Sequence, residues 1–146
     1  MGLFSKKPSG SQQVYIQSAI NEVQTQYKYL TQVERVDWFL EAYENIYKSM
    51  NFLLDSEKRF PSFFGKHTPS TNMKKIESER NEMEKQFIDR FFLSIEKKLL
   101  EYSTMRGKKN NFIKETDKFR YYAGEFLPES VDYFNNIIET RYPEYM

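Results

Sequence analysis

The sequence contains no cysteine and a single histidine, His67. The lack of cysteine excludes disulfide bonds, thiol catalysis and Cys-based zinc or iron–sulfur sites. One histidine cannot supply the ligands of a classical zinc or copper site, nor the Glu-x-x-His pairs of a di-iron bundle. Because His67 lies in a Lys-His-Thr-Pro stretch without a nucleophile signature, we interpret it as an ordinary loop residue. We therefore expect no metal and no catalytic site.

Glycine and long apolar runs are also scarce. None of the five glycines belongs to a Gly-rich pattern that brings the backbone close to nucleotide phosphates, so no cofactor is expected. No stretch approaches the roughly 18 consecutive apolar residues of a transmembrane helix. The first residues also lack the apolar core of a secretory signal. These absences lead us to expect a cytoplasmic protein that is not an enzyme and has no transmembrane segment.

Neither sign of charge is in excess, since 22 basic residues face 21 acidic ones. Nucleic-acid-binding domains usually carry a clear basic surplus, so this balance argues against a dedicated one. Aromatic residues, in contrast, are abundant, with 13 Phe, 11 Tyr and one Trp. Large rings bury much area each, and they allow a compact core despite the polar average. The richness in Lys, Asn, Ile, Tyr and Phe is typical of AT-rich coding, as in a low-GC bacterium or its phage.

Apolar residues recur at three- and four-residue steps along most of the chain, which is typical of amphipathic helices. Strand signals are missing, because there is no sustained alternation and no Asn-Gly or Asp-Gly turn. The predicted helices cover approximately residues 11–28, 32–58, 71–105, 110–124 and 128–142. Thr31 and Glu34 have capping-box spacing, which fits either the start of a second helix or an adjustment within one long helix. Arg106 and Gly107 are interpreted as the C-terminal end of the third.

The predicted fold class is all-α, a helical bundle of two to three long helices with two short C-terminal helices. A single domain is expected over residues 11–142, between a disordered tail at 1–10 and a second tail at 143–146. The second helix carries an apolar heptad stripe from Val33 to Leu54, with a parallel stripe beside it. Such a wide apolar face fits the interior of a bundle. The same face also fits contact with a second copy of the chain, so a homodimer stays an alternative.

The connector between the second and third predicted helices contains three phenylalanines, Phe60, Phe63 and Phe64. We expect the three rings to pack across the end of the bundle. The alternative is that they are candidate contacts for a protein partner, because clustered exposed rings mark interaction surfaces.

The segment 106–120 carries six cations against two anions. Lysines and arginines beside stacking aromatics hold nucleic acid in many proteins. Phe112 and Phe119 are interleaved here, although both also fall on the apolar face of the predicted helix. The candidate contacts for an anion or nucleic acid are Arg106, Lys108, Lys109, Lys114, Lys118 and Arg120.

These residues do not identify a specific role. The favoured hypothesis is a non-catalytic protein-interaction or structural protein, because catalytic patterns are lacking while aromatic and heptad surfaces are plentiful. A nucleic-acid or anion-binding accessory protein that uses segment 106–120 is the alternative, and a metal-independent enzyme ranks third.

Overall fold

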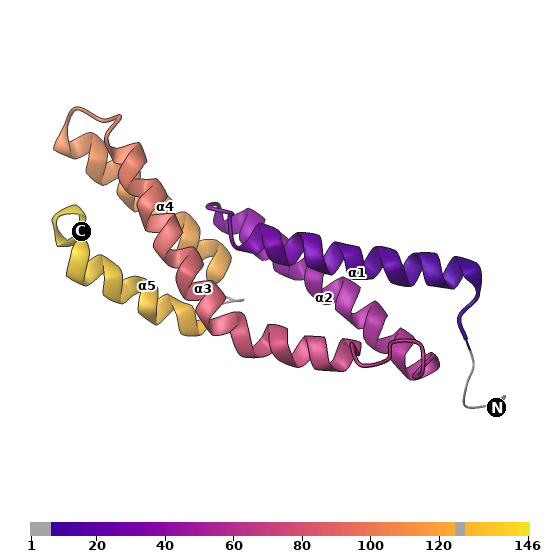
Figure 1. The fold of residues 1–146 in the computed structure, drawn as a ribbon. Helices are drawn as coiled ribbons and strands as arrows, with labels where there is room; N and C mark the ends of the chain where they lie inside the picture. Colours follow the sequence, from indigo (N-terminus) through magenta and orange to yellow (C-terminus); the bar gives the residue numbers. More distant parts are fainter. Residues whose placement is uncertain (1–6, 125–127) are drawn as a thin grey trace. The chain divides into compact units, whose positions relative to one another are not determined.

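The computed structural model describes residues 7–124 and 128–146 (Figure 1). Most of these residues are helical and none lies in a strand, so the prediction of an all-α chain is confirmed. The elements are α1 (Gly10–Leu30), α2 (Val36–Arg59), α3 (Pro69–Leu99), α4 (Met105–Ala123), α5 (Pro128–Arg141) and the 3-10 turn η2 (Pro143–Tyr145).

The chain divides into two compact units, which are described separately. Unit 1 holds Glu41–Arg80 and the described residues up to Leu30. Unit 2 holds Thr31–Leu40 and the described residues from Asn81 to Met146. The single domain over 11–142 and the assembly of the helices into one bundle stay predictions.

A capping box begins α1, at a position that the sequence analysis assigned to the N-terminal tail. The Ser9 hydroxyl accepts a hydrogen bond from the Gln12 amide at 3.2 Å, and the Ser9 amide donates to the Gln12 side chain at 2.6 Å. In this way, two backbone N–H groups that have no carbonyl partner within the helix receive a hydrogen-bond acceptor. Helix α1 therefore begins at Gly10. The predicted disorder of residues 1–6 falls outside the described residues.

Helix α2 begins later than its predicted capping box. Thr31 lies in a turn, and the first helical residue is Val36. The Phe39 amide donates to the Arg35 carbonyl at 3.0 Å, which closes the first helical turn there. Val33, in the non-helical stretch, and Val36, the first helical residue, are both buried.

The predicted end of the third helix is wrong. Helix α3 ends at Leu99, and Gly107 lies in the first turn of α4 rather than after the end of α3. Thr104 adopts an extended backbone and its hydroxyl accepts from the Gly107 amide at 3.1 Å, which makes Thr104 the N-cap of α4. The N-cap bond satisfies a free N–H group and starts a new helix within five residues of the previous one. Segment 106–120 consequently lies wholly within α4.

Unit 2 has an aromatic core. Phe119 of α4 and Phe134 of α5 stack with their ring centroids 3.9 Å apart, and Phe91 of α3 lies 5.2 Å from Phe119. The core reaches the end of the chain, where the ring of Tyr145 lies 5.0 Å from that of Phe112. Rings in such contacts stabilise a fold beyond the area that they bury. The 3-10 turn at Pro143–Tyr145 therefore packs on α4, at residues that the sequence analysis assigned to a tail.

Candidate functional site

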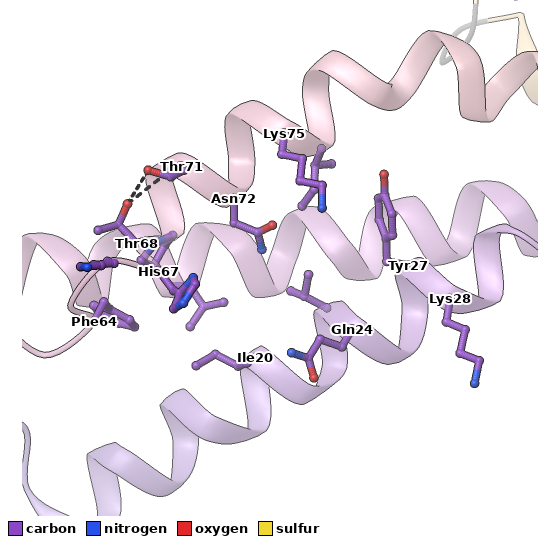
Figure 2. A pocket seen from close by; sticks show the side chains of 15 residues that line it. Ile20, Gln24, Tyr27, Lys28, Phe64, His67, Thr68, Thr71, Asn72 and Lys75 are labelled. Atoms are coloured by element: carbon purple, nitrogen blue, oxygen red, sulfur yellow. Dashed lines mark hydrogen bonds between the residues drawn. The ribbon is translucent and has the colours of Figure 1, made fainter.

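A groove of about 630 Å³ opens on the surface of unit 1 (Figure 2). Its walls come from one face of α1, one residue of α2, the connector between α2 and α3, and the first turns of α3. Phe64 and His67 lie at one end of the groove, and Tyr27 and Lys28 lie at the other. Its volume falls within the range of about 300–1,000 Å³ that is typical of ligand pockets.

The periodicity of α1 explains which of its residues face the groove. Its lining residues are Ile20, Val23, Gln24, Tyr27 and Lys28. Their steps of three and four residues place all five on one side of a helix. Val23 is buried at the base of this side, whereas Ile20 is half-buried and reachable from the groove.

The floor of the groove is apolar. Leu53 of α2 and Ile76 of α3 line it and are buried, and the half-buried ring of Phe64 lines its end. Asn72 and Lys75 project from α3 on the side opposite Ile20 (Figure 2). An apolar floor with a few polar groups at its edge is the usual composition of a binding site.

The rim of the groove is cationic. Lys28, Lys66 and Lys75 line it together with His67, and none of the described residues that line it is an Asp or Glu. Lys66, Lys75 and His67 are exposed to solvent. A concave surface with charge of one sign attracts ligands of the opposite charge. The groove is therefore suited to an apolar group that carries negative charge.

Tyr27 joins the groove to a carboxylate behind it. Its hydroxyl donates a hydrogen bond to Glu79 of α3. Burial raises the pKa of Tyr27 above its ordinary value, and the hydrogen bond and the charge of Glu79 raise it further. Tyr27 is therefore a neutral hydrogen-bond donor at ordinary pH rather than a nucleophile or base.

Local hydrogen bonds hold the connector in place. Gly65 adopts a left-handed backbone with φ of 59°, which is why the chain can turn between Phe64 and Lys66. Thr68 caps α3, since its hydroxyl accepts from the Thr71 amide at 3.3 Å, and Pro69 occupies the first helical position. The connector that forms one wall of the groove is therefore held by a backbone turn and a helix cap rather than by packing between helices.

A carboxylate of α2 reinforces the same helix start. Glu57 accepts hydrogen bonds from the Ser70 amide at 2.9 Å and from the Ser70 hydroxyl at 2.9 Å. A negative charge at a helix N-terminus is favourable because the free N–H groups and the helix dipole point toward it. This contact positions the first turn of α3 against α2.

The three candidate phenylalanines have different environments. Phe60 is only 1% exposed and belongs to the core, as expected for a ring packed across the end of the helices. Phe63 is 40% exposed and contacts Phe64 edge-to-face, with centroids 5.3 Å apart. Phe63 and Phe64 are thus the members of this set that a partner can reach.

The six cations of segment 106–120 are dispersed around α4. At about 100° per residue, Lys114 and Lys118 fall on one side of the helix, and Lys109 and Arg120 fall on another, about 140° away. Arg120 also forms an ion pair with Asp117 at 3.3 Å and donates to Asn135 at 3.1 Å.

Phe112 and Phe119, which the sequence analysis considered as stacking platforms, are buried. Bases cannot stack on rings that are enclosed in a core. Segment 106–120 therefore lacks both a single cationic stripe and accessible aromatic platforms.

Unit 2 has a smaller cleft of about 260 Å³, which includes Lys98, Glu115 and Lys118. Its charges are mixed, and Lys98 pairs with Glu115 at 3.6 Å. Arg35 of the same cleft forms an ion pair with Asp37 at 2.6 Å, and this hydrogen-bonded contact lowers the pKa of Asp37. The mixture of signs gives this cleft no preference for an anion or a cation.

No protein-family model, curated protein or solved structure matches the chain. Within the described parts of the chain, no cluster of His, Cys, Asp or Glu is arranged to hold a metal ion. No helix among the described residues is long and apolar enough to cross a membrane.

Most of the groove was not predicted from the sequence. Phe64 was a candidate partner contact and His67 was interpreted as an ordinary loop residue, whereas Gln24 and Lys75 were not among the candidate residues. The spacing of Ile20, Gln24 and Lys28 at i, i+4 and i+8 was the available signal, because it places a polar edge on a partly apolar helix face. Nothing in the sequence indicated that the start of α3 would lie opposite this face.

Proposed function

We propose that this chain is a non-catalytic interaction protein that binds a segment of a partner protein in the groove of unit 1. The observation that carries the proposal is the combination of an apolar floor with a rim of lysines and no acidic lining residue. The ligand that fits this combination is a short peptide segment with apolar side chains flanked by Asp or Glu. Apolar side chains would bury on Ile20 and Phe64, while the carboxylates would pair with the lysines.

The length of the groove supports a short segment. From Ile20 to Lys28, the face of α1 extends about 12 Å at 1.5 Å per residue, which is about two helical turns of a bound peptide. The exposed ring of Phe63 lies next to Phe64 and extends the apolar surface beyond the groove.

Nucleic-acid binding through segment 106–120 is the less favoured alternative. Its cations are dispersed, and the two rings that would stack with bases belong to the core of unit 2.

Homodimer formation stays a prediction. It is compatible with the proposal, because each copy in a dimer would still carry its own groove. Sedimentation equilibrium of the purified chain measures it directly.

Matched variants within one pull-down test the proposal. Ile20→Glu places a negative charge in the groove, and Ser18→Glu adds the same charge to the opposite side of α1. Lys75→Glu reverses a rim charge, and Lys74→Glu reverses the neighbouring exposed charge outside the groove. Each tagged protein is incubated with lysate of the source organism, with and without nuclease treatment, and a captured protein is then purified and titrated directly.

We expect a nuclease-resistant partner whose affinity falls at least about tenfold with Ile20→Glu and Lys75→Glu, because central interface residues dominate binding energy. Ser18→Glu and Lys74→Glu should bind as the wild type does. A partner that binds all four variants equally would place the interface elsewhere. Capture that disappears with nuclease would instead support the nucleic-acid alternative. Tight retention of a small anionic molecule in the groove would also contradict the proposal.

A further inference from the structure

The turn between α3 and α4 in unit 2 exposes large apolar side chains. Leu100 is 82% exposed and Met105 is 57% exposed, and Tyr102 between them is also exposed. Single exposed apolar residues are ordinary, but three within six positions form a local patch. The same unit buries Leu99, which directly precedes this patch. The exposure of Leu100 therefore marks an abrupt change from core to surface along the chain.

Cations surround this apolar turn. Residues 97–109 contain five Lys or Arg residues and one acidic residue, Glu101. Lys97, Arg106 and Lys109 are exposed to solvent. Lys98 pairs with Glu115 at 3.6 Å. The turn thus combines protruding apolar side chains with a local excess of positive charge.

Hydrogen bonds hold the turn in one conformation. The Thr104 hydroxyl caps α4 by accepting from the Gly107 amide at 3.1 Å. The Asn111 side chain donates to the Tyr102 hydroxyl at 3.1 Å, which fixes the ring against the first turns of α4. A preorganised turn loses little conformational freedom when it contacts a surface.

From this combination we infer that the α3–α4 turn is a contact site for an anionic lipid membrane, at which the chain binds peripherally. Leu100 and Met105 would enter the boundary between headgroups and acyl chains, while the neighbouring lysines and arginines contact anionic headgroups. A nucleic acid offers phosphates to the cations but no hydrocarbon for Leu100 and Met105. The apolar residues at the tip of the turn therefore favour a membrane. This inference concerns unit 2 and is independent of the groove in unit 1.

Vesicle flotation with the full chain tests the inference. Vesicles of phosphatidylcholine alone are compared with vesicles that also contain phosphatidylserine, at low and at high salt. Two double variants alter the turn, Leu100→Ser with Met105→Ser and Arg106→Glu with Lys109→Glu. Tyr121→Ser is the apolar control, since Tyr121 is exposed near the other end of α4. Lys58→Glu with Lys74→Glu, both exposed in unit 1, is the charge control.

The expected result is binding of the wild type and both controls to phosphatidylserine vesicles only, and weakening of this binding by salt. Each double variant of the turn should bind at least about tenfold more weakly. All substitutions are at exposed positions, and far-UV circular dichroism verifies that each variant remains helical.

A second measurement locates the contact. Leu100→Trp is combined with Trp38→Phe, so that the introduced indole is the single tryptophan, and Tyr121→Trp in the same background is the control. The emission of the Leu100→Trp protein should shift to shorter wavelength on anionic vesicles, and that of the Tyr121→Trp protein should not.

Absence of wild-type binding to phosphatidylserine vesicles would overturn the inference. An unchanged emission of the Leu100→Trp protein would also overturn it. Binding of a single-stranded RNA probe that needs Arg106 and Lys109 but tolerates Leu100→Ser with Met105→Ser would assign the turn to nucleic acid instead.

Discussion

The hydroxyl of Tyr27 on α1 donates a hydrogen bond to the carboxylate of Glu79 on α3, which lies 52 residues further along the chain. The bond joins the two helices that form opposite walls of the groove. The Glu79 carboxylate keeps its negative charge in this bond, and Glu79 is not among the residues that line the groove. The contact therefore ties together the two helices between which a ligand would lie.

Tyr27→Phe should destabilise unit 1 by about 1–2 kcal/mol, since it removes a hydrogen bond to a charged group while retaining the ring. Because the folded-state pKa of Tyr27 is raised, its contribution is fully present below about pH 10, the pKa of an unfolded tyrosine. The contribution is lost as the pH rises from there through the folded-state pKa. Urea unfolding followed by far-UV circular dichroism measures the difference between the two proteins. A difference that stays constant from about pH 9 to about pH 11 would contradict this assignment.

Ser130→Ala should destabilise unit 2 by about 2 kcal/mol. The Ser130 hydroxyl donates to Glu84 at 2.6 Å, and both side chains are buried, so the substitution takes a donor away from a buried carboxylate. Fluorescence of Trp38, the only tryptophan and a member of unit 2, follows the unfolding. Thr140→Ala on the same helix is the control. Its exposed hydroxyl donates only to carbonyls of its own helix, so a change below about 0.5 kcal/mol is expected.

Phe119→Ala should cost about 3–5 kcal/mol, the range for truncating a phenylalanine in a core. Phe119 stacks on Phe134 and contacts Phe91, so its removal leaves a cavity among rings that cannot all move to fill it. Tyr121→Ala, two positions away and exposed, should change stability by less than about 0.5 kcal/mol. The Trp38 unfolding transition measures both. Equal effects of the two substitutions would contradict the aromatic core described for unit 2.

Thr104→Ala should lower stability by about 1 kcal/mol, whereas Thr104→Ser should restore most of it because the capping oxygen remains. Asn110→Ala tests the competing helix start that the sequence suggested. With α4 beginning at Met105, Asn110 is an internal position, and alanine there should leave stability unchanged or raise it slightly. Loss of stability with Asn110→Ala but not with Thr104→Ala would show that the helix begins at the later position.

The outcome at the helix boundaries shows what local sequence signals can predict. The approximate positions of the helices followed from apolar periodicity, because that pattern reflects which side of each helix is buried. The residues at which the helices begin were less predictable from the sequence. Thr31, Thr104 and Thr68 are all suitable caps, but only the last two are used at a helix start. The choice depends on which neighbouring side chains the rest of the fold buries, and a local pattern does not contain that information.

The sequence by itself determined that this chain is helical, lacks thiol chemistry and has too few histidines for a classical metal site, since these properties depend on residue type and periodicity. Only the tertiary structure decided that Phe60 is core while Phe64 lines a groove. The same holds for Phe112 and Phe119, whose rings face a core rather than solvent. Likewise, the cationic rim arises because α1, the connector and the start of α3 come together in unit 1. The physical reason is that burial depends on contacts between residues far apart in the chain, whereas periodicity specifies only which side of each helix is apolar.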